Sequence, residues 1–143
     1  LPGRGHIVEL ADGIELLDDS YNANVASIEA ALLTLSRRDG TTIAVLGDVM
    51  ELGEFEEDEH RRIGRIPALE SVDHLVFVGE RMSWAAEEAS LLDHPSVRSF
   101  VESDPEEVAE YVKSLLEPGS GVLVKGSRLM RLEEVVERLR DLS

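Results

Sequence analysis

The sequence predicts an α/β fold, with a Rossmann-like, open and mostly parallel sheet flanked by helices and a short hairpin at its start. Two observations lead to this prediction. Apolar, β-branched segments alternate along the chain with segments whose apolar residues recur every three or four positions. The first pattern is typical of strands buried in a parallel sheet, and the second of amphipathic helices. Such alternation favours right-handed crossovers with helices on both faces of one sheet.

The N-terminal part predicts a strand pair followed by a helix. Two short apolar segments, residues 6–10 and 14–17, are separated by the turn sequence Ala11-Asp12-Gly13, which is typical of a hairpin. Over residues 26–38 the apolar side chains fall three or four positions apart, and Gly40 follows as a helix stop.

The remaining elements alternate between strand and helix. We expect a buried strand at the TTIAVLGDV segment, residues 41–49, and a charged helix at roughly 57–69. Asp104 is a favourable N-cap and Pro105 a favourable first helical residue. The elements expected after residue 70 are strands at 74–78, 97–100 and 121–125, and helices at 81–90, 105–116 and 131–142.

Composition limits the classes of partner and compartment. A chain of 143 residues is the size of one domain and can bury a core without disulfides. Thirty acidic residues against fourteen basic ones give a net charge of -16, which opposes binding to nucleic acid or an anionic membrane. Without cysteine, signal sequence or long apolar run, we expect a cytoplasmic protein with no membrane insertion. Because the chain begins at Leu1, we also expect it to be a piece of a longer one.

A polar cluster follows the second expected strand, in the sequence DDSYNAN. Asn24 is accounted for as the N-cap of the next helix, but one cap explains only one side chain. Two adjacent acids, Asp18 and Asp19, repel each other unless a cation, a hydroxyl-rich ligand or hydrogen-bond donors receive them. We therefore expect Asp19 to be functional and Asp18 to accept hydrogen bonds from nearby backbone amides.

Further polar residues follow two other strands, at the edge where open α/β sheets bind ligands. Asp48 and Glu51 stand at the end of an apolar strand, where they can coordinate magnesium, accept an ammonium group or remain solvated. Lys125 ends the last strand and is followed by Ser127 and Arg128, so that three anion-binding groups can converge. No phosphate-loop motif G-x-x-x-x-G-K-[ST] is present, so any phosphate must be held partly by another protein segment.

Four motifs together resemble the C-terminal domain of the Mur ligases. They are PGRGH near the start, DDSYNAN, LGDVMELG with His60 downstream, and VLVKGSRLMRLEEVV near the end. Their order is that of the family, and residues 70–118 contribute little to the resemblance. Within the family, the chain is most similar to the ligases that add D-alanyl-D-alanine to UDP-N-acetylmuramoyl-tripeptide.

The resemblance implies that residues 1–143 form the Rossmann-like third domain of a three-domain, ATP-dependent enzyme of peptidoglycan synthesis. In this family the central domain brings the phosphate loop and the Mg²⁺ ligands, and the N-terminal domain holds the UDP-sugar. The C-terminal domain closes over ATP and presents the incoming dipeptide, whose amine attacks an acyl phosphate. The implied partners are the chain's own upstream domains and the two substrates. The chain alone is expected to have no catalytic residue or metal ligand and no activity.

The family motifs also imply site residues. Arg4 matches an arginine at the domain junction that reaches the nucleotide, and Asp19 matches a widely shared acid that contacts ATP. Tyr21, Asn22 and Asn24 belong to the same nucleotide-side loop. The residues matched to the side of the incoming dipeptide are Asp48, Glu51, Lys125, Ser127 and Arg128. Val25 departs from the family, which usually has proline there, and this loosens the assignment to one branch.

Three alternatives remain open from the sequence. A phosphorylation-receiver domain also has two acids after one strand, an aspartate after another and a lysine after a later one, and Asp18, Asp19, Asp48 and Lys125 match this order. The early hairpin and the glycine-serine-arginine that follows the lysine argue against it. The second alternative is a Mur-like ligase domain that adds a different amino acid, and the third is a catalytically silent binding module.

Overall fold

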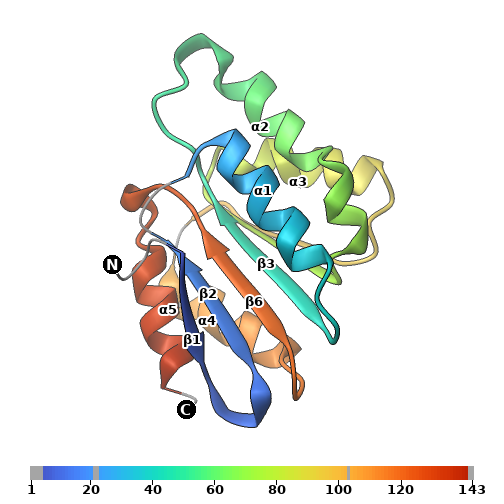
Figure 1. Cartoon of the computed structure of the whole chain (residues 1–143). Helices are drawn as coiled ribbons and strands as arrows, with labels where there is room; N and C mark the ends of the chain where they lie inside the picture. The colour runs from blue at the N-terminus through green and yellow to red at the C-terminus, as the bar shows by residue number, and fades with distance from the viewer. Residues whose placement is uncertain (1–4, 21–22, 103, 142–143) are drawn as a thin grey trace.

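Six strands form one sheet in the computed structural model, which describes residues 5–20, 23–102 and 104–141 (Figure 1). The strand order is β1-β2-β6-β3-β4-β5, and among the strand pairs of these described residues only β1–β2 is antiparallel. The predicted open, mostly parallel sheet with an N-terminal hairpin is therefore confirmed. The strands are β1 His6–Glu9, β2 Glu15–Asp19, β3 Thr42–Gly47, β4 His74–Val78, β5 Val97–Phe100 and β6 Gly121–Lys125.

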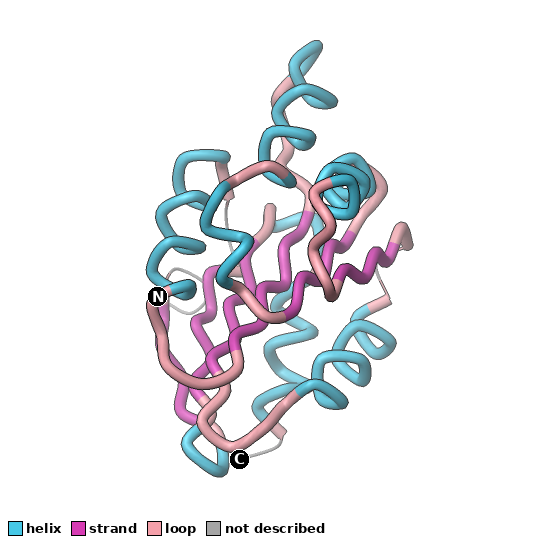
Figure 2. The backbone as a smooth tube through the Cα atoms, turned by 90° about the vertical axis from the view of Figure 1, so that its right-hand side faces the viewer, coloured by secondary structure: helices cyan, strands magenta, loops and turns pink. Residues whose placement is uncertain are grey.

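Helices cover both faces of the sheet (Figure 2). One hydrophobic cluster joins the sheet to α1, α2 and α3, and a second joins its other face to α4 and α5. Strand β3 shows how the sequence divides between them, because Ile43 and Val45 belong to one cluster and Ala44 and Leu46 to the other. The helices are α1 Val25–Ser36, α2 Glu56–Gly64, α3 Met82–Leu91, α4 Pro105–Leu115 and α5 Leu132–Arg140.

Strand β6 lies in the middle of the sheet although it comes late in the chain (Figure 1). It pairs in parallel with β2 on one side and β3 on the other, and Lys125 is in register with Asp19 and with Leu46. The carboxyl ends of β2, β6 and β3 therefore lie side by side at one edge of the sheet. We call this edge the carboxyl-end rim, and it carries most of the described residues that the sequence singled out.

The helix expected over residues 57–69 is wrong at its C-terminal end. Helix α2 stops at Gly64, and a separate 3-10 helix follows at Pro67–Ser71. Proline has no backbone N–H and disfavours helical dihedrals in the residue before it. Ile66 accordingly adopts φ -58° and ψ 124°, which breaks the helix. The other expected helices agree with the structure within two residues.

Strand β2 continues two residues further than expected, so Asp18 and Asp19 lie within the strand rather than after it. They pair with Val124 and Lys125 of β6, and this ladder keeps two acids of low strand propensity extended. Among the described residues, no helix has both the length and the apolar character needed to cross a bilayer.

Candidate functional site

A buried ion pair occupies the carboxyl-end rim. Lys125, the last residue of β6, is 3% exposed, and its ammonium donates to the Asp19 carboxylate at the end of β2. An ammonium group is costly to bury without a partner. The parallel register places Asp19 directly beside Lys125, so the fold itself supplies that partner.

Asp18 is held by its own neighbourhood, as expected. It is 3% exposed, and its Oδ1 accepts hydrogen bonds from the Ser20 backbone N–H at 3.2 Å and from the Ser20 hydroxyl at 2.6 Å. Asp18 therefore serves the turn that follows β2, and Asp19 is the acid that faces Lys125.

Asp48 lies directly after β3 and connects that strand to α3. Its Oδ1 accepts from the Met82 N–H at 2.7 Å, and its Oδ2 accepts from the Arg81 N–H at 3.2 Å and from Arg81 Nη1 at 3.5 Å. A carboxylate at a helix N-terminus is favourable because the first amides of the helix have no partner within it. Asp48 is 2% exposed, so this carboxylate positions α3 relative to β3.

Arg81 carries the connection one step further. Its Nε donates to Glu56 Oε2 at 3.0 Å, so the start of α2 is tied to the start of α3. The hydrogen bond from Glu56, together with the nearby charges of Glu56 and Asp48, raises the pKa of Arg81 above its ordinary value. The guanidinium thus keeps its positive charge and joins the start of α2 to the end of β3.

A groove of about 420 Å³ opens at the rim between the start of α1 and the loop after β3. Its lining residues are Ala23, Asn24, Val49, Met50, Glu51, Leu52, Ser127 and Leu129. Three predicted site residues from distant segments, Asn24, Glu51 and Ser127, therefore meet in one groove. The sequence assigned Asn24 to the nucleotide side and the other two to the dipeptide side, whereas the structure places all three together.

The polar groups of this groove differ in what already binds them. Asn24 caps α1, because its Oδ1 accepts from the Ser27 N–H at 2.8 Å. Ser127 is 7% exposed, and its hydroxyl has no hydrogen-bond partner within the described part of the chain. Glu51 is exposed and has a left-handed backbone, with φ 65°.

His60 holds the loop that forms one wall of the groove. It is fully buried, its Nε2 accepts from the Val49 N–H at 3.0 Å, and its Nδ1 lies 2.7 Å from the Glu56 carbonyl oxygen. Because a carbonyl only accepts, Nδ1 carries the proton. His60 therefore holds the loop after β3 against the start of α2.

Two residues of this site were missed by the sequence-based prediction. Gly79 has φ 114°, and a Cβ there would run into the Asp48 carboxylate. Arg81 follows two residues later and contacts the same carboxylate. The only signal was the position of the GERM segment directly after a strand, because the partner in each case lies more than thirty residues earlier.

Four predicted site residues lie outside this description. Arg4, Tyr21 and Asn22 are not among the described residues, and the side chain of Arg128 is not described. Over residues 5–20, 23–102 and 104–141, no group of three or more His, Asp or Glu side chains is arranged to hold a metal ion.

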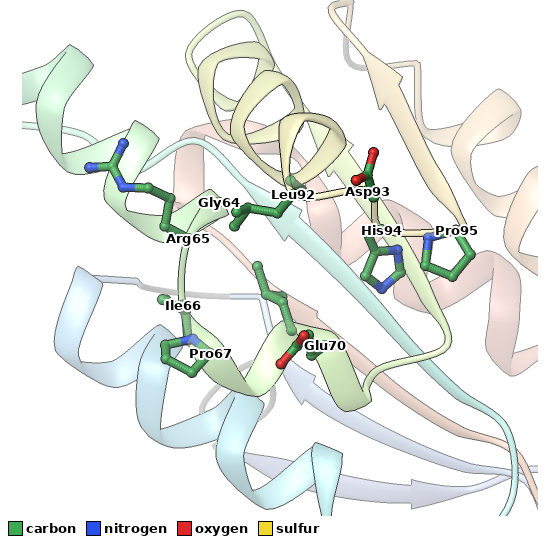
Figure 3. A pocket seen from close by; sticks show the side chains of 11 residues that line it. Gly64, Arg65, Ile66, Pro67, Glu70, Leu92, Asp93, His94 and Pro95 are labelled. Atoms are coloured by element: carbon green, nitrogen blue, oxygen red, sulfur yellow. The ribbon is translucent and has the colours of Figure 1, made fainter.

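A second cavity, of about 500 Å³, lies away from the rim (Figure 3). It is formed by the segments that precede β4 and β5, including Ile66, Leu92 and His94, at the amino ends of these strands. His94 donates from Nε2 to the Val72 carbonyl at 2.8 Å and accepts at Nδ1 from the Ser96 N–H at 3.1 Å. Its ring is thus satisfied by the protein, and we place the candidate site at the rim instead.

Known proteins resemble this chain in sequence over nearly its whole length. Residues 3–128 match the family described as "Mur ligase, glutamate ligase domain". The UDP-N-acetylmuramoyl-tripeptide--D-alanyl-D-alanine ligase of Escherichia coli is 33% identical over 143 residues, which are 99% of this chain and 30% of the relative. The Bacillus subtilis protein of the same name is 32% identical over 138 residues, 95% of this chain and 30% of the relative.

The fold is also that of a solved relative. The crystal structure of MurF ligase from Thermotoga maritima in complex with ADP matches with a TM-score of 0.83 and 27% identity, covering 99% of this chain and 31% of that one. The chain therefore spans about 30% of the length of the relatives that it matches.

Proposed function

The chain belongs to the Mur ligase family, and on that premise we propose that it is the C-terminal domain of a three-domain ligase. In this proposal the whole enzyme uses ATP to join D-alanyl-D-alanine to UDP-N-acetylmuramoyl-tripeptide, in peptidoglycan precursor synthesis in the cytoplasm. The observation that carries the proposal is the 33% identity to the Escherichia coli ligase over 99% of this chain. The resemblance first seen in the four motifs is confirmed by this match and by the family match.

The rim supplies a division of roles for the proposed reaction. On the nucleotide side we place Arg4, Asp19, Tyr21, Asn22 and Asn24, with Asp19 oriented by its ion pair to Lys125. On the dipeptide side we place Asp48, Glu51, Lys125, Ser127 and Arg128. Asp48 acts there by holding the start of α3, since its oxygens are already engaged by protein donors.

The proposed chemistry needs groups that this chain is not expected to contain. ATP transfers its terminal phosphoryl group to the acceptor carboxylate, which yields ADP and an acyl phosphate. The neutral amine of the dipeptide then attacks the acyl carbon. The C–N bond forms, the C–O bond to phosphate breaks, and the nitrogen releases one proton to solution. Phosphoryl transfer depends on Mg²⁺ and a phosphate loop, which we assign to the central domain. The present chain closes the site and positions the amine.

The test is to join the chain to its upstream domains and to measure ADP release. We expect release only when the UDP-linked tripeptide and D-alanyl-D-alanine are both present, and none from residues 1–143 alone. In the joined enzyme, Asp19→Asn is expected to lower activity and to raise the KM for ATP. Turnover by the chain alone would contradict the proposal, and so would ADP release that does not depend on the dipeptide.

The receiver-domain alternative has lost its main support. A receiver needs an accessible aspartate to accept a phosphoryl group, and Asp48 was the candidate. Its carboxylate is 2% exposed and accepts from the backbone amides of Arg81 and Met82. The acid that resembled a phospho-acceptor is therefore engaged as a helix anchor.

A further inference from the structure

A buried histidine controls the position of one wall of the groove without lining the groove itself. The loop after β3 supplies half of the lining residues, namely Val49, Met50, Glu51 and Leu52. His60 of α2 is fully buried and does not belong to that lining. The residue that holds the loop is therefore separate from the residues that a ligand in the groove would contact.

The middle of this loop has few contacts of its own. Within the described ranges, the backbone N–H groups of residues 50–52 donate to no protein acceptor. Glu51 also lies in the left-handed region, with φ 65°, which is unfavourable for a residue other than glycine. A strained segment of this kind keeps its conformation only where the surrounding structure holds it. The contacts at the ends of the loop therefore decide where its middle lies.

His60 provides such a contact at the first end of the loop. Val49 is 2% exposed, and its N–H donates to His60 Nε2 at 3.0 Å. The Glu56 carbonyl oxygen, 2.7 Å from Nδ1, keeps the proton on Nδ1 and leaves Nε2 as the acceptor. The imidazole ring also lies 6.2 Å from the ring of Trp84 in α3, tilted by 53°. His60 thus connects the loop to both helices, and replacing it leaves a buried donor without an acceptor.

We propose that His60 is a positioning residue for the reaction proposed above, on which this inference rests. By accepting from the Val49 N–H, it keeps the wall of the groove in the place where the dipeptide is bound. It acts through the loop and does not contact the dipeptide. Loss of the acceptor favours other loop positions by about tenfold, for one buried and unpaired N–H. The apparent affinity for the dipeptide then falls by the same factor, because only the competent fraction binds.

His94 is a matched control near the opposite edge of the sheet. Like His60, it accepts from a backbone N–H, that of Ser96 at 3.1 Å, and donates to a backbone carbonyl, that of Val72 at 2.8 Å. It lies at the amino ends of β4 and β5, away from the rim. Its replacement therefore removes the same kind of hydrogen bond and leaves the loop after β3 in place.

The test compares the two histidines in the enzyme made by joining the chain to its upstream domains. We expect His60→Leu to raise the KM for D-alanyl-D-alanine about tenfold. His94→Leu should leave this KM within about twofold of the wild-type value, while a smaller folded fraction lowers only kcat. His60→Gln should bring the KM back to within about threefold of wild type, because its side-chain oxygen can accept from the Val49 N–H.

Three results overturn the proposal. They are a KM for His60→Leu equal to that of wild type, an equal rise in both leucine variants, and no recovery in His60→Gln. If His60→Leu does not fold, His60→Asn takes its place in the comparison, because its side chain is polar but too short to reach the Val49 N–H.

A failure of the proposed function would look different. If the joined wild-type enzyme releases no ADP with both substrates, the loop is followed directly by amide hydrogen exchange in residues 1–143. His60→Leu should speed exchange of the Val49 amide about tenfold and leave that of Ser96 unchanged, and His94→Leu should do the reverse. Unchanged exchange of the Val49 amide in His60→Leu overturns the role of His60 in holding the loop.

Discussion

Acidic side chains near the rim differ in what already holds them. Asp18 and Asp48 are buried and accept hydrogen bonds from nearby backbone amides. Asp19 pairs with Lys125. Glu51, only three residues after Asp48, is exposed on a strained backbone. All four side chains are carboxylates, so their surroundings, and not their chemistry, separate the acids that hold the fold from those open to solvent.

Gly79 is the residue whose replacement should disturb the rim most. Gly79→Ala places a methyl group against the hydrogen-bonded Asp48 carboxylate on a backbone with φ 114°. Strain and overpacking together should lower the free energy of unfolding by about 2–6 kcal/mol. Gly53→Ala is the control, because Gly53 has φ 57° and no atom within 4 Å of an added Cβ. Its cost should be about 1–2 kcal/mol, and urea unfolding of both variants would show whether the order is reversed.

The Asp19–Lys125 pair should contribute more to stability than a pair at the sheet's other end. Asp19→Asn removes the charge that faces an ammonium which is 3% exposed. We expect a loss of about 2–3 kcal/mol, below the range for pairs in which both partners are fully buried. Glu15→Gln breaks the pair with Arg38, whose side chains are 37% and 33% exposed, and should cost less than about 1 kcal/mol. Equal losses in denaturant unfolding would contradict this expectation.

At the scale of elements, charged side chains join α2 to α3. Arg61 of α2 and Arg65, the residue directly after α2, each donate to Glu88 of α3 at 2.8 Å. The hydrogen bond from Arg65, followed by that from Arg61, lowers the pKa of Glu88 below its ordinary value. Gly64 lies against the Ala85 backbone, so the two helices approach closely where this cluster forms.

The lowered pKa of Glu88 predicts a pH dependence of stability. A depressed folded-state pKa means that the interaction stabilises the fold above the ordinary value of 4.5 and is lost as pH falls through the folded value. Glu88→Gln should therefore lower the melting temperature at pH 7 and have little effect below the folded pKa. Glu29→Gln, on the exposed face of α1, should show no such contrast. A Glu88→Gln effect that persists unchanged in acid would contradict the prediction.

Most element positions could be predicted because their causes are local. The capping box of Asn24 and Ser27 and the Asp104 cap are set by neighbours in sequence. The length of β2 could not be predicted, because Asp19 is kept in the strand by a residue 106 positions later. The end of α2 was a misjudged local signal, since Pro67 is visible in the sequence. The sequence could predict that polar residues gather at one edge of the sheet, because they follow the ends of its strands. It could not predict the groove, because three segments that are distant in sequence form its lining.

At the scale of the whole molecule, the chain has sixteen more acidic than basic residues. At neutral pH the negative charges within one folded molecule therefore repel one another. Raising NaCl from about 0.05 M to about 0.5 M shortens the screening length from roughly 14 Å to roughly 4 Å. The relief of repulsion should outweigh the weakening of exposed ion pairs, so the melting temperature should rise. A triple variant, E29Q/D39N/E117Q, should show a smaller rise. A melting temperature that falls with salt would mean that the ion pairs dominate.

The central position of β6 governs when this protein can fold during its own synthesis. A ribosome delivers the chain from the N-terminus at about 5–20 residues per second. Residues 121–125 arrive near the end, yet they fill the gap between β2 and β3. Until they emerge, no strand pairing joins the β1–β2 hairpin to strands β3, β4 and β5. The sheet can therefore close only after residue 125 has been made, and until then the edges of β2 and β3 that face β6 stay unpaired.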